Sequence, residues 1–257
     1  MIIGPVIGSV TQGSNVNQKD DDFIITIDTT LPGSASNTIV FPLRAKTAND
    51  VVIKWGDGSE DSYSTVGDKT HVYASSGIYQ VRVNKEMTAF SFNNTGDKLK
   101  AIFHDNWGSS EFISMYGAFW GCTNIQYRAS DFPNTSQVTD MGRMFFGTPF
   151  NQSVANFDTS KVTNMGYMFY NTPFKHSINF NIPLVTDLGF MFQYCNVNEV
   201  GTTANYDLTL NNFANNPNTP NNLNFHGGNS KYSAAGKVGR DILIGKGWTI
   251  TDGGLAV

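Results

Sequence analysis

The stretch Met141-Gly-Arg-Met-Phe-Phe-Gly-Thr148 is one of four copies of the same phrase; the others are Met115-Tyr-Gly-Ala-Phe-Trp-Gly-Cys122, Met165-Gly-Tyr-Met-Phe-Tyr-Asn-Thr172 and Leu188-Gly-Phe-Met-Phe-Gln-Tyr-Cys195. The copies begin 23 to 26 residues apart. A period of about 20–29 residues is typical of leucine-rich-repeat-like solenoids, in which each unit stacks on its neighbour because it cannot bury its apolar face alone. The phrase therefore predicts a short solenoid.

Large apolar residues stand at the first, fourth and fifth positions of the copies, as in Met141, Met144 and Phe145. This spacing matches one face of a short helix, so we expect each copy to be a helical turn whose Met and Phe side chains fill the interior. Thr and Asp or Asn precede the copies and can accept hydrogen bonds from free N–H groups at a helix start. Pro149 and Pro173 follow and end the helix, and the alternating residues after them predict strands.

The outward side chains of these strands form the candidate binding face, which consists of Gln126, Arg128, Gln152, Ser153, Lys175 and Ser177. Tyr127, Val154 and Ile178 would then point inward. A shift of one residue would exchange the two faces, because side chains alternate along a strand. A sheet lined with Gln, Ser and Lys suits a glycan or a protein receptor; the alternative is a solvated sheet with no function.

The run Val162-Thr-Asn-Met-Gly-Tyr-Met-Phe-Tyr-Asn171, preceded by Asp158-Thr-Ser-Lys161, resembles the repeat of the BspA-like surface proteins. These proteins carry a variant of the leucine-rich repeat and include bacterial lipoproteins and adhesins. The resemblance covers residues 97–200, in four copies that are in phase. It implies an exposed, non-catalytic binding surface and does not identify the ligand.

The composition favours an exported β-rich protein over a cytosolic enzyme. Charged residues make up only 15% of the chain and aromatic residues 13%, while Asn and Thr are abundant. The net charge of −4 argues against a nucleic-acid partner, which requires a basic stripe. The sequence contains no run of 18 apolar residues, so we expect no membrane insertion.

The two cysteines hold the eighth position of the first and the last copy, and Thr148 and Thr172 hold that position between them. Stacked strands rise about 4.8 Å per turn, so three turns would separate Cys122 from Cys195 by about 14 Å. A disulfide requires Cα atoms within about 7 Å. We therefore predict two free, buried thiols.

Residues 1–22 are interpreted as an N-terminal arm with an apolar tip that contains Ile2, Ile3, Val6 and Ile7. The tip lacks the basic region and the cleavage site of a secretory signal. We therefore expect either that a leader has been removed or that the protein leaves its cell as part of a particle. In the second case the tip would be an assembly arm that docks on another chain; the alternative is a frayed terminus.

Residues 23–92 are predicted to form an immunoglobulin-like β-sandwich, because short β-branched and aromatic runs alternate there with turn signals. The phrase Trp55-Gly-Asp-Gly-Ser59, followed by His71-Val-Tyr73, resembles the PKD domain of extracellular proteins. The resemblance implies a spacer or a display scaffold.

The acidic residues Asp57, Glu60 and Asp61 suggest a calcium site, but the ligand spacing of an EF-hand is absent. We instead expect Asp57 to accept backbone hydrogen bonds within its turn and His71 to anchor that turn. His104 and Asp105 are not expected to form a catalytic pair, because adjacent residues at a strand end point to opposite sides.

Residues 93–230 are assigned to the solenoid and residues 231–257 to a C-terminal cap. Residues 99–103 are predicted to start the solenoid sheet, residues 206–210 to be a degenerate turn and residues 222–226 to be a strand. Helical spacing in the cap predicts one helix, with Ser230 or Ser233 as its N-cap and with an apolar face of Ala234, Ala235, Val238, Ile242 and Leu243. A last strand is expected over residues 248–250.

Together these features predict a β-rich α+β fold and a non-enzymatic recognition or adhesion protein on a virion, on a cell surface or outside the cell. Three carriers stay open: a virion attachment component such as a tail fibre or a capsid decoration protein, a BspA-type bacterial adhesin whose leader has been removed, and a purely structural virion protein. The expected partners are a host-surface glycan or protein receptor, and other virion proteins or further copies of the chain.

Enzymatic activity is not expected. Gly-x-Ser-x-Gly, P-loop and zinc-spaced His and Cys patterns are missing from the sequence. The few acidic residues of the repeats stand mostly in cap and turn contexts, whereas a glycosidase needs two carboxylates at a set distance. No cofactor or metal site is predicted.

Overall fold

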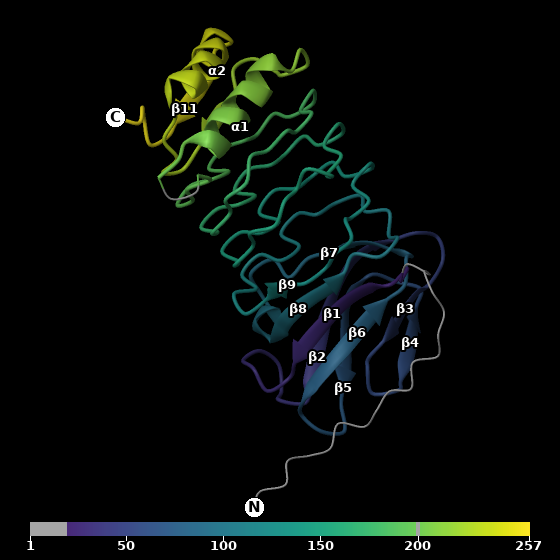
Figure 1. The fold of residues 1–257 in the computed structure, drawn as a ribbon. Helices are drawn as coiled ribbons and strands as arrows, with labels where there is room; N and C mark the ends of the chain where they lie inside the picture. Colours follow the sequence, from purple (N-terminus) through teal and green to yellow (C-terminus); the bar gives the residue numbers. More distant parts are fainter. Residues whose placement is uncertain (1–19, 199–200) are drawn as a thin grey trace, which may run out of the picture.

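The computed structural model describes residues 20–198 and 201–257, so the predicted assembly arm with Ile2, Ile3, Val6 and Ile7 lies outside the described residues. The described chain runs from antiparallel sheets at one end, through stacked turns, to two helices packed together at the other (Figure 1). The predicted β-rich α+β class is confirmed at this level.

Two sheets make up the N-terminal part. The larger sheet has the strand order β4 (Glu60–Tyr63), β3 (Val51–Lys54), β6 (Ile78–Val83), β1 (Phe23–Asp28), β8 (Ala101–Asn106) and β9 (Gln126–Tyr127). The smaller sheet has the order β5 (Gly67–Val72), β2 (Thr38–Lys46) and β7 (Met87–Phe90). All neighbours are antiparallel except β8 and β9. Phe23 of the larger sheet contacts Phe41 and Phe90 of the smaller one, so the sheets share one core.

Strand β8 joins this part to the repeats. It follows a short 3₁₀ helix, η1 (Lys98–Lys100), and pairs with β1 on one side and with β9 of the first repeat on the other. The strand predicted to start the solenoid sheet is thus also a strand of the sandwich. Beside it, the ring of Phe90 lies 5.1 Å from the ring of Phe119. The predicted boundary between residues 92 and 93 therefore falls within a continuous core.

The repeats are runs of tight turns, and the predicted short helices are wrong. In the second copy, the N–H groups of Met144 and Phe146 donate to the carbonyls of Met141 and Arg143, three residues back. The N–H groups between them donate to the next copy instead: Arg143 donates to Gly166 at 3.0 Å and Phe145 to Met168 at 3.0 Å. Because every second N–H is used between copies, the continuous i to i−4 bonding of a helix cannot form.

Left-handed residues make this alternation possible. The third and seventh residues of all four copies have φ between 52° and 79°: Gly117, Arg143, Tyr167 and Phe190 at the third position, and Gly121, Gly147, Asn171 and Tyr194 at the seventh. Side chains other than glycine pay a steric cost in this region. The hydrogen bonds to neighbouring copies offset that cost, and the left-handed residues turn the backbone at regular intervals.

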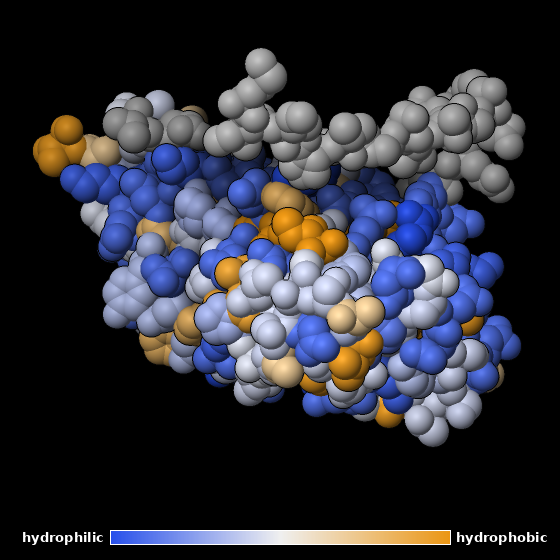
Figure 2. All heavy atoms as spheres, turned by 90° about the horizontal axis from the view of Figure 1, so that it is seen from below, coloured by the Kyte–Doolittle hydropathy of each residue, from blue (hydrophilic) through white to orange (hydrophobic). Residues whose placement is uncertain are grey.

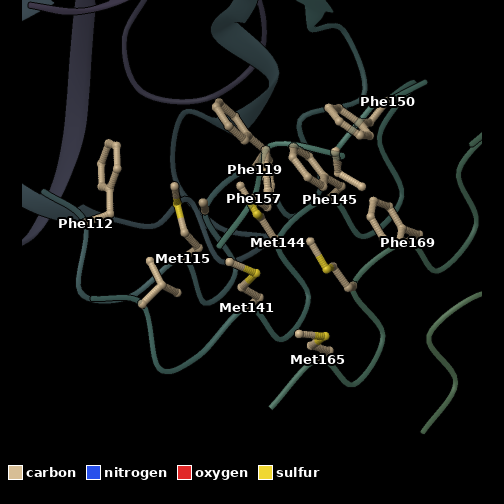
Figure 3. Packing of buried hydrophobic residues seen from close by; sticks show 14 of the residues in the cluster. Phe112, Met115, Phe119, Met141, Met144, Phe145, Phe150, Phe157, Met165 and Phe169 are labelled. Atoms are coloured by element: carbon tan, nitrogen blue, oxygen red, sulfur yellow. The ribbon is translucent and has the colours of Figure 1, made fainter. Parts of the chain in front are cut away.

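The predicted interior of Met and Phe side chains is confirmed. Phe119, Phe145, Phe169 and Phe192 are fully buried, and successive rings stack at 6.1, 5.8 and 5.4 Å between centroids. Figure 3 shows Phe119, Phe145 and Phe169 in one row and Met115, Met141 and Met165 in a second. The repeats thus share one apolar core despite their irregular backbone.

The predicted N–H acceptors before the copies are also present, although turns follow them instead of helices. The Oδ1 atoms of Asp140, Asn164 and Asp187 accept the N–H groups of Gly142, Gly166 and Gly189 at 2.7–2.9 Å. Asn164 also donates from Nδ2 to Asp140 Oδ1 at 3.0 Å, so these side chains form a polar column along the stack. A Cβ atom on Gly142 would lie 2.6 Å from Asn164 Nδ2, which explains the glycine.

Cys122 and Cys195 are free and buried, as predicted. Burial raises the pKa of both thiols. The predicted strands after the prolines are wrong, since residues 152–157 and 176–180 have no regular secondary structure. Val154 and Ile178 nevertheless point inward and are buried.

The C-terminal part contains two helices where one was expected. Helix α1 (Ala204–Asn215) replaces the predicted degenerate turn, because Tyr206, Leu210 and Phe213 form one buried face. The strands predicted over residues 222–226 and 248–250 are present as β10 (Asn224–His226) and β11 (Thr249–Thr251), and they pair in parallel.

The predicted cap helix is α2 (Ala234–Gly245), and Ser233 caps it by accepting the N–H of Ala235. Its predicted apolar face is wrong except for Leu243: Ala234, Ala235, Val238 and Ile242 are exposed. Gly236 and Gly239 face α1 instead, since a Cβ there would collide with Asp207 and Asn211.

Candidate functional site

The predicted binding face is only partly a free surface. Gln126, Arg128 and Ser153 are exposed, whereas Gln152, Lys175 and Ser177 are half-buried. The side chain of Gln152 donates to the carbonyl of Tyr127 at 2.9 Å, and Asn205 of α1 donates to the carbonyl of Lys175 at 2.9 Å. Helix α1 therefore lies against the end of this face.

A hollow of about 320 Å³ on this side is lined by Gln152 and Ser153 but by none of the other four predicted residues. Asp131, which also lines it, accepts the N–H groups of Trp107 and Gly108 at 2.9–3.1 Å. The carboxylate is thus held by backbone groups. Of the six predicted residues, only Gln152 and Ser153 line this hollow, and a binding role of the face stays a prediction.

A different outer face of the repeats carries a continuous row of aromatic rings. We call it the aromatic column; it consists of Trp120, Phe146, Tyr167, Tyr170, Phe190 and Tyr194. Phe146 and Tyr170 stack at 4.3 Å and 17°, and Tyr167 and Phe190 at 4.9 Å and 25°. Contacts of 5.2–6.0 Å join the remaining rings, three of them between copies and one, Tyr167 with Tyr170, within the third copy.

Arg143 fixes the start of the aromatic column. Its guanidinium carbon lies 5.2 Å from the ring centre of Trp120 and 4.8 Å from that of Tyr167. Its Nη1 atom donates to the hydroxyl of Tyr116 at 2.9 Å. A cation between ring faces attracts both rings, so Arg143 holds neighbouring copies in register.

The column combines flat apolar faces with access to solvent. Phe190 is 44% and Tyr194 60% exposed, and the other four rings are half-buried. On the sandwich, Val66, Val72 and Ile78 are exposed apolar residues, and the view from that end shows apolar residues in separate small groups among hydrophilic ones (Figure 2). Exposed rings are thus contiguous on the aromatic column, whereas exposed apolar residues are scattered on the sandwich, so the column is the better surface for a ligand to stack on.

Sequence reasoning missed this surface although the signal was present. The sixth position is aromatic in three of the four copies, as Trp120, Phe146 and Tyr170. In the expected helix with positions one, four and five inward, position six points outward. An aromatic residue recurring at an outward position indicates a surface for contact and not core packing.

Two other candidate groups are structural. Asp57 accepts the N–H of Ser59 and bonds to His71 Nε2, both at 2.9 Å, and His71 stacks on Trp55, as expected for a turn anchor. Burial opposes ionisation of Asp57, but the hydrogen bonds of Ser59 and His71 outweigh it and lower the pKa to about 2.

His104 and Asp105 do not form a pair. His104 is fully buried among Phe23, Trp107 and Phe119, and burial lowers its pKa to about 3. Asp105 instead accepts the hydroxyl of Thr26 at 2.6 Å.

The part of the chain that the structure describes contains no group of three or more His, Cys, Asp and Glu residues positioned to hold a metal ion. No helix within residues 20–198 and 201–257 is long and apolar enough to cross a membrane.

The stacked repeats and their outer surfaces define a leucine-rich-repeat-like protein. Residues 85–204, slightly less than half of the chain, match a family described as "Mycoplasma protein of unknown function, DUF285". This family is leucine-rich-repeat-like, consists of surface lipoproteins and is related to BspA, so the resemblance of the repeats is supported. The match does not include residues 23–84, and the PKD-like resemblance stays a prediction. Comparisons with curated proteins and with solved structures gave no match.

Proposed function

We propose that this chain is a non-enzymatic recognition protein of a cell surface that binds glycans through the aromatic column. The observation that carries the proposal is the continuity of the column across all four copies, with partly exposed rings next to a core that is already complete without them. The sandwich would act as the predicted display scaffold for this surface.

The family match supports the location. A relationship to leucine-rich-repeat-like surface lipoproteins favours a cell-surface carrier, which is one of the three carriers that the sequence left open. None of the comparisons supports the virion alternatives, whether attachment component or structural protein.

A glycan fits the chemistry of the column better than a protein receptor does. The C–H groups on one face of a sugar ring pack on flat aromatic faces, and a row of rings offers several such positions in sequence. The neighbouring side chains of the polar column, Asp140, Asn164 and Asp187, can bond to hydroxyl groups. Arg143, a cation beside the column, is held by rings and by Tyr116.

Binding of neutral oligosaccharides and of intact cells to the purified chain tests the proposal. We expect Trp120→Ala and Tyr194→Ala, at opposite ends of the column, each to weaken binding at least tenfold. Ile78→Ala, an exposed residue of the sandwich, is the matched control and should bind normally. Equal binding by all three variants, with unchanged melting temperatures, would reject the column as the ligand-contacting face.

A further inference from the structure

Two rings of the aromatic column, Tyr167 and Phe190, border a hollow of about 470 Å³ between the third and fourth copies and the strands β10 and β11. Its lining includes Tyr167, Phe190, Asp187, Asn224, His226 and Thr251. A volume of this size lies within the range of small-ligand sites, about 300–1,000 Å³. None of its lining residues is a Lys or Arg.

One wall of the hollow is aromatic. The rings of Tyr167 and Phe190 stack at 4.9 Å, and the imidazole of His226 continues them at 6.1 Å from Phe190, tilted by 30°. The wall therefore extends the aromatic column beyond the last copy and into the C-terminal sheet. A sugar ring packed on it would lie in line with others along the column.

Asp187 supplies a carboxylate oxygen that the fold does not use. Its Oδ1 atom accepts the N–H of Gly189 at 2.7 Å, while Oδ2 has no hydrogen-bond partner among the described residues. In the preceding copies Asn164 Nδ2 donates to Asp140 Oδ1, so the polar column is closed there. The residue that follows Asp187 in register is Asn224, since Leu188 is paired with Phe225. The two side chains make no hydrogen bond to each other in the described structure, which leaves an acceptor and an amide for a ligand.

His226 supplies a donor of defined position. Its Nδ1 atom accepts the N–H of Gly228 at 3.1 Å, so the proton of the neutral ring is on Nε2. Burial lowers the pKa of His226, which keeps the ring neutral at pH 7. The exposed hydroxyl of Thr251 adds a further donor and acceptor on β11.

We infer that this hollow is a subsite for one neutral hexopyranose unit of the glycan, an inference that rests on the proposed function. The C–H face of the sugar packs on the aromatic wall. Asp187 accepts hydrogen bonds from the sugar hydroxyl groups, and Asn224 and His226 donate hydrogen bonds to them. A phosphate or an acidic sugar does not fit, because the free Asp187 oxygen would repel it and no lining cation would compensate. The aromatic wall and the pairing of acceptor with donors together select an uncharged polyol.

The test measures binding of methyl hexopyranosides and of neutral oligosaccharides to the whole chain by NMR titration. Asp187→Asn keeps Oδ1 for the turn, as Asn164 does in the preceding copy, and replaces the free oxygen by an amide. We expect it to weaken monosaccharide binding at least tenfold. Asp158→Asn makes the same substitution in a turn that lies outside the hollow, where Oδ1 accepts the N–H of Ser160, and it should bind as the unchanged chain does. Thr251→Val removes one hydroxyl without changing the shape of the side chain and should cost severalfold.

The outcomes separate this inference from the proposed function. If oligosaccharides bind and Tyr194→Ala weakens them while Asp187→Asn does not, the column stands and the subsite is overturned. If a methyl hexopyranoside with a carboxylate group binds as tightly as a neutral one, the assigned ligand class is wrong. If no sugar binds to the unchanged chain, both the glycan function and its subsite fail.

Discussion

The sandwich and the repeats bury their apolar residues equally well but use the backbone differently. In the sandwich, strands of four to nine residues pair in continuous ladders, as β2 does with β5 over residues 38–43. In the repeats, N–H groups alternate between a carbonyl in their own turn and a carbonyl of the next copy. Both arrangements satisfy the buried backbone groups. Regular secondary structure is therefore not needed for a continuous core when identical turns stack in register.

The sandwich and the repeats also differ in which parts of the chain their strands and copies pack against. Most strands of the sandwich have a partner far away in the sequence, as β1 has in β8, whereas the two inner copies stack on the copies before and after them. The sandwich provides the first layer through Phe90 and Phe119, and the C-terminal part provides the last through Phe192 and Phe225. We expect the two regions to unfold as one cooperative unit, and the following substitutions test this.

The largest effect is expected from a cavity in the middle of the stack. Phe145→Ala removes a ring that contacts Phe119, Phe150 and Phe169, and should lower the free energy of unfolding by about 3–5 kcal/mol. Urea unfolding followed by circular dichroism and by tryptophan fluorescence measures the loss.

Phe41→Ala provides the matched cavity in the sandwich, since Phe41 is also buried and contacts Phe23 and Phe90. If the regions form one unit, both variants shift a single transition by similar amounts. A curve with two transitions for Phe145→Ala alone would show that the repeats unfold separately from the sandwich.

Acid should destabilise the place where the two regions meet. His104 of β8 is fully buried, neither ring nitrogen has a hydrogen-bond partner, and burial lowers its pKa from 6.5 to about 3. The unfolded chain takes up the proton first, so stability is present above pH 6.5 and is lost as the pH falls towards 3. The loss between pH 7 and pH 4 should be on the order of 3 kcal/mol, and His104→Leu should remove most of it.

Two comparisons test whether this loss of stability in acid comes from His104. His176→Gln, outside the core, should leave the loss between pH 7 and pH 4 in place. The stabilisation from Asp57 belongs to the sandwich and is lost only at lower pH, as the pH falls from 3.8 towards its lowered pKa of about 2. An unchanged acid profile in His104→Leu would mean that the junction opens without unfolding.

The core of the repeats was predictable from the sequence, whereas their backbone was not. The first, fourth and fifth positions identify buried Met and Phe residues in any geometry that puts those positions on one side. The spacing cannot distinguish a helix from a run of turns with left-handed residues. The sequence does not show that Arg143, Tyr167 and Phe190 are left-handed, because the hydrogen bonds that stabilise this conformation are made with adjacent copies.

The candidate site was missed for a related reason. Polar residues at Gln152 and Lys175 suggested a binding face because they alternate with buried ones. The side chain of Gln152, however, donates to the carbonyl of Tyr127, and the backbone N–H of Lys175 donates to Asn151 Oδ1. The aromatic column joins residues from the third, sixth and seventh positions of the copies, and only their contacts in space show that they form one surface. Helix α2 was predicted, yet two of its three buried residues are Gly236 and Gly239, which no apolar pattern reveals.

A smaller effect is expected from one methyl group between copies. Gly142→Ala should lower the free energy of unfolding by roughly 1–3 kcal/mol, because the new Cβ would lie 2.6 Å from Asn164 Nδ2 and would separate two copies. The melting temperature reports the change. Gly245→Ala in α2 is the control: a Cβ there meets nothing within 4 Å, and the substitution should stabilise the helix by up to about 1 kcal/mol. Equal effects of the two substitutions would mean that the copies are not tightly stacked.

The smallest effect concerns local opening at the two ends of the stack. Cys122 lies in the first copy, next to the sandwich, and Cys195 in the last, and both are buried with raised thiol pKa values. Reaction with a thiol reagent at pH 8 therefore reports opening, and the single variants Cys122→Ala and Cys195→Ala show each site alone. The sandwich is a fixed layer of two sheets, whereas the other end is covered by short elements. We expect Cys195 to react about tenfold faster, a difference of about 1.4 kcal/mol in opening. Equal rates at both sites would show that the thiols react only through complete unfolding, and that sandwich and repeats behave as a single body.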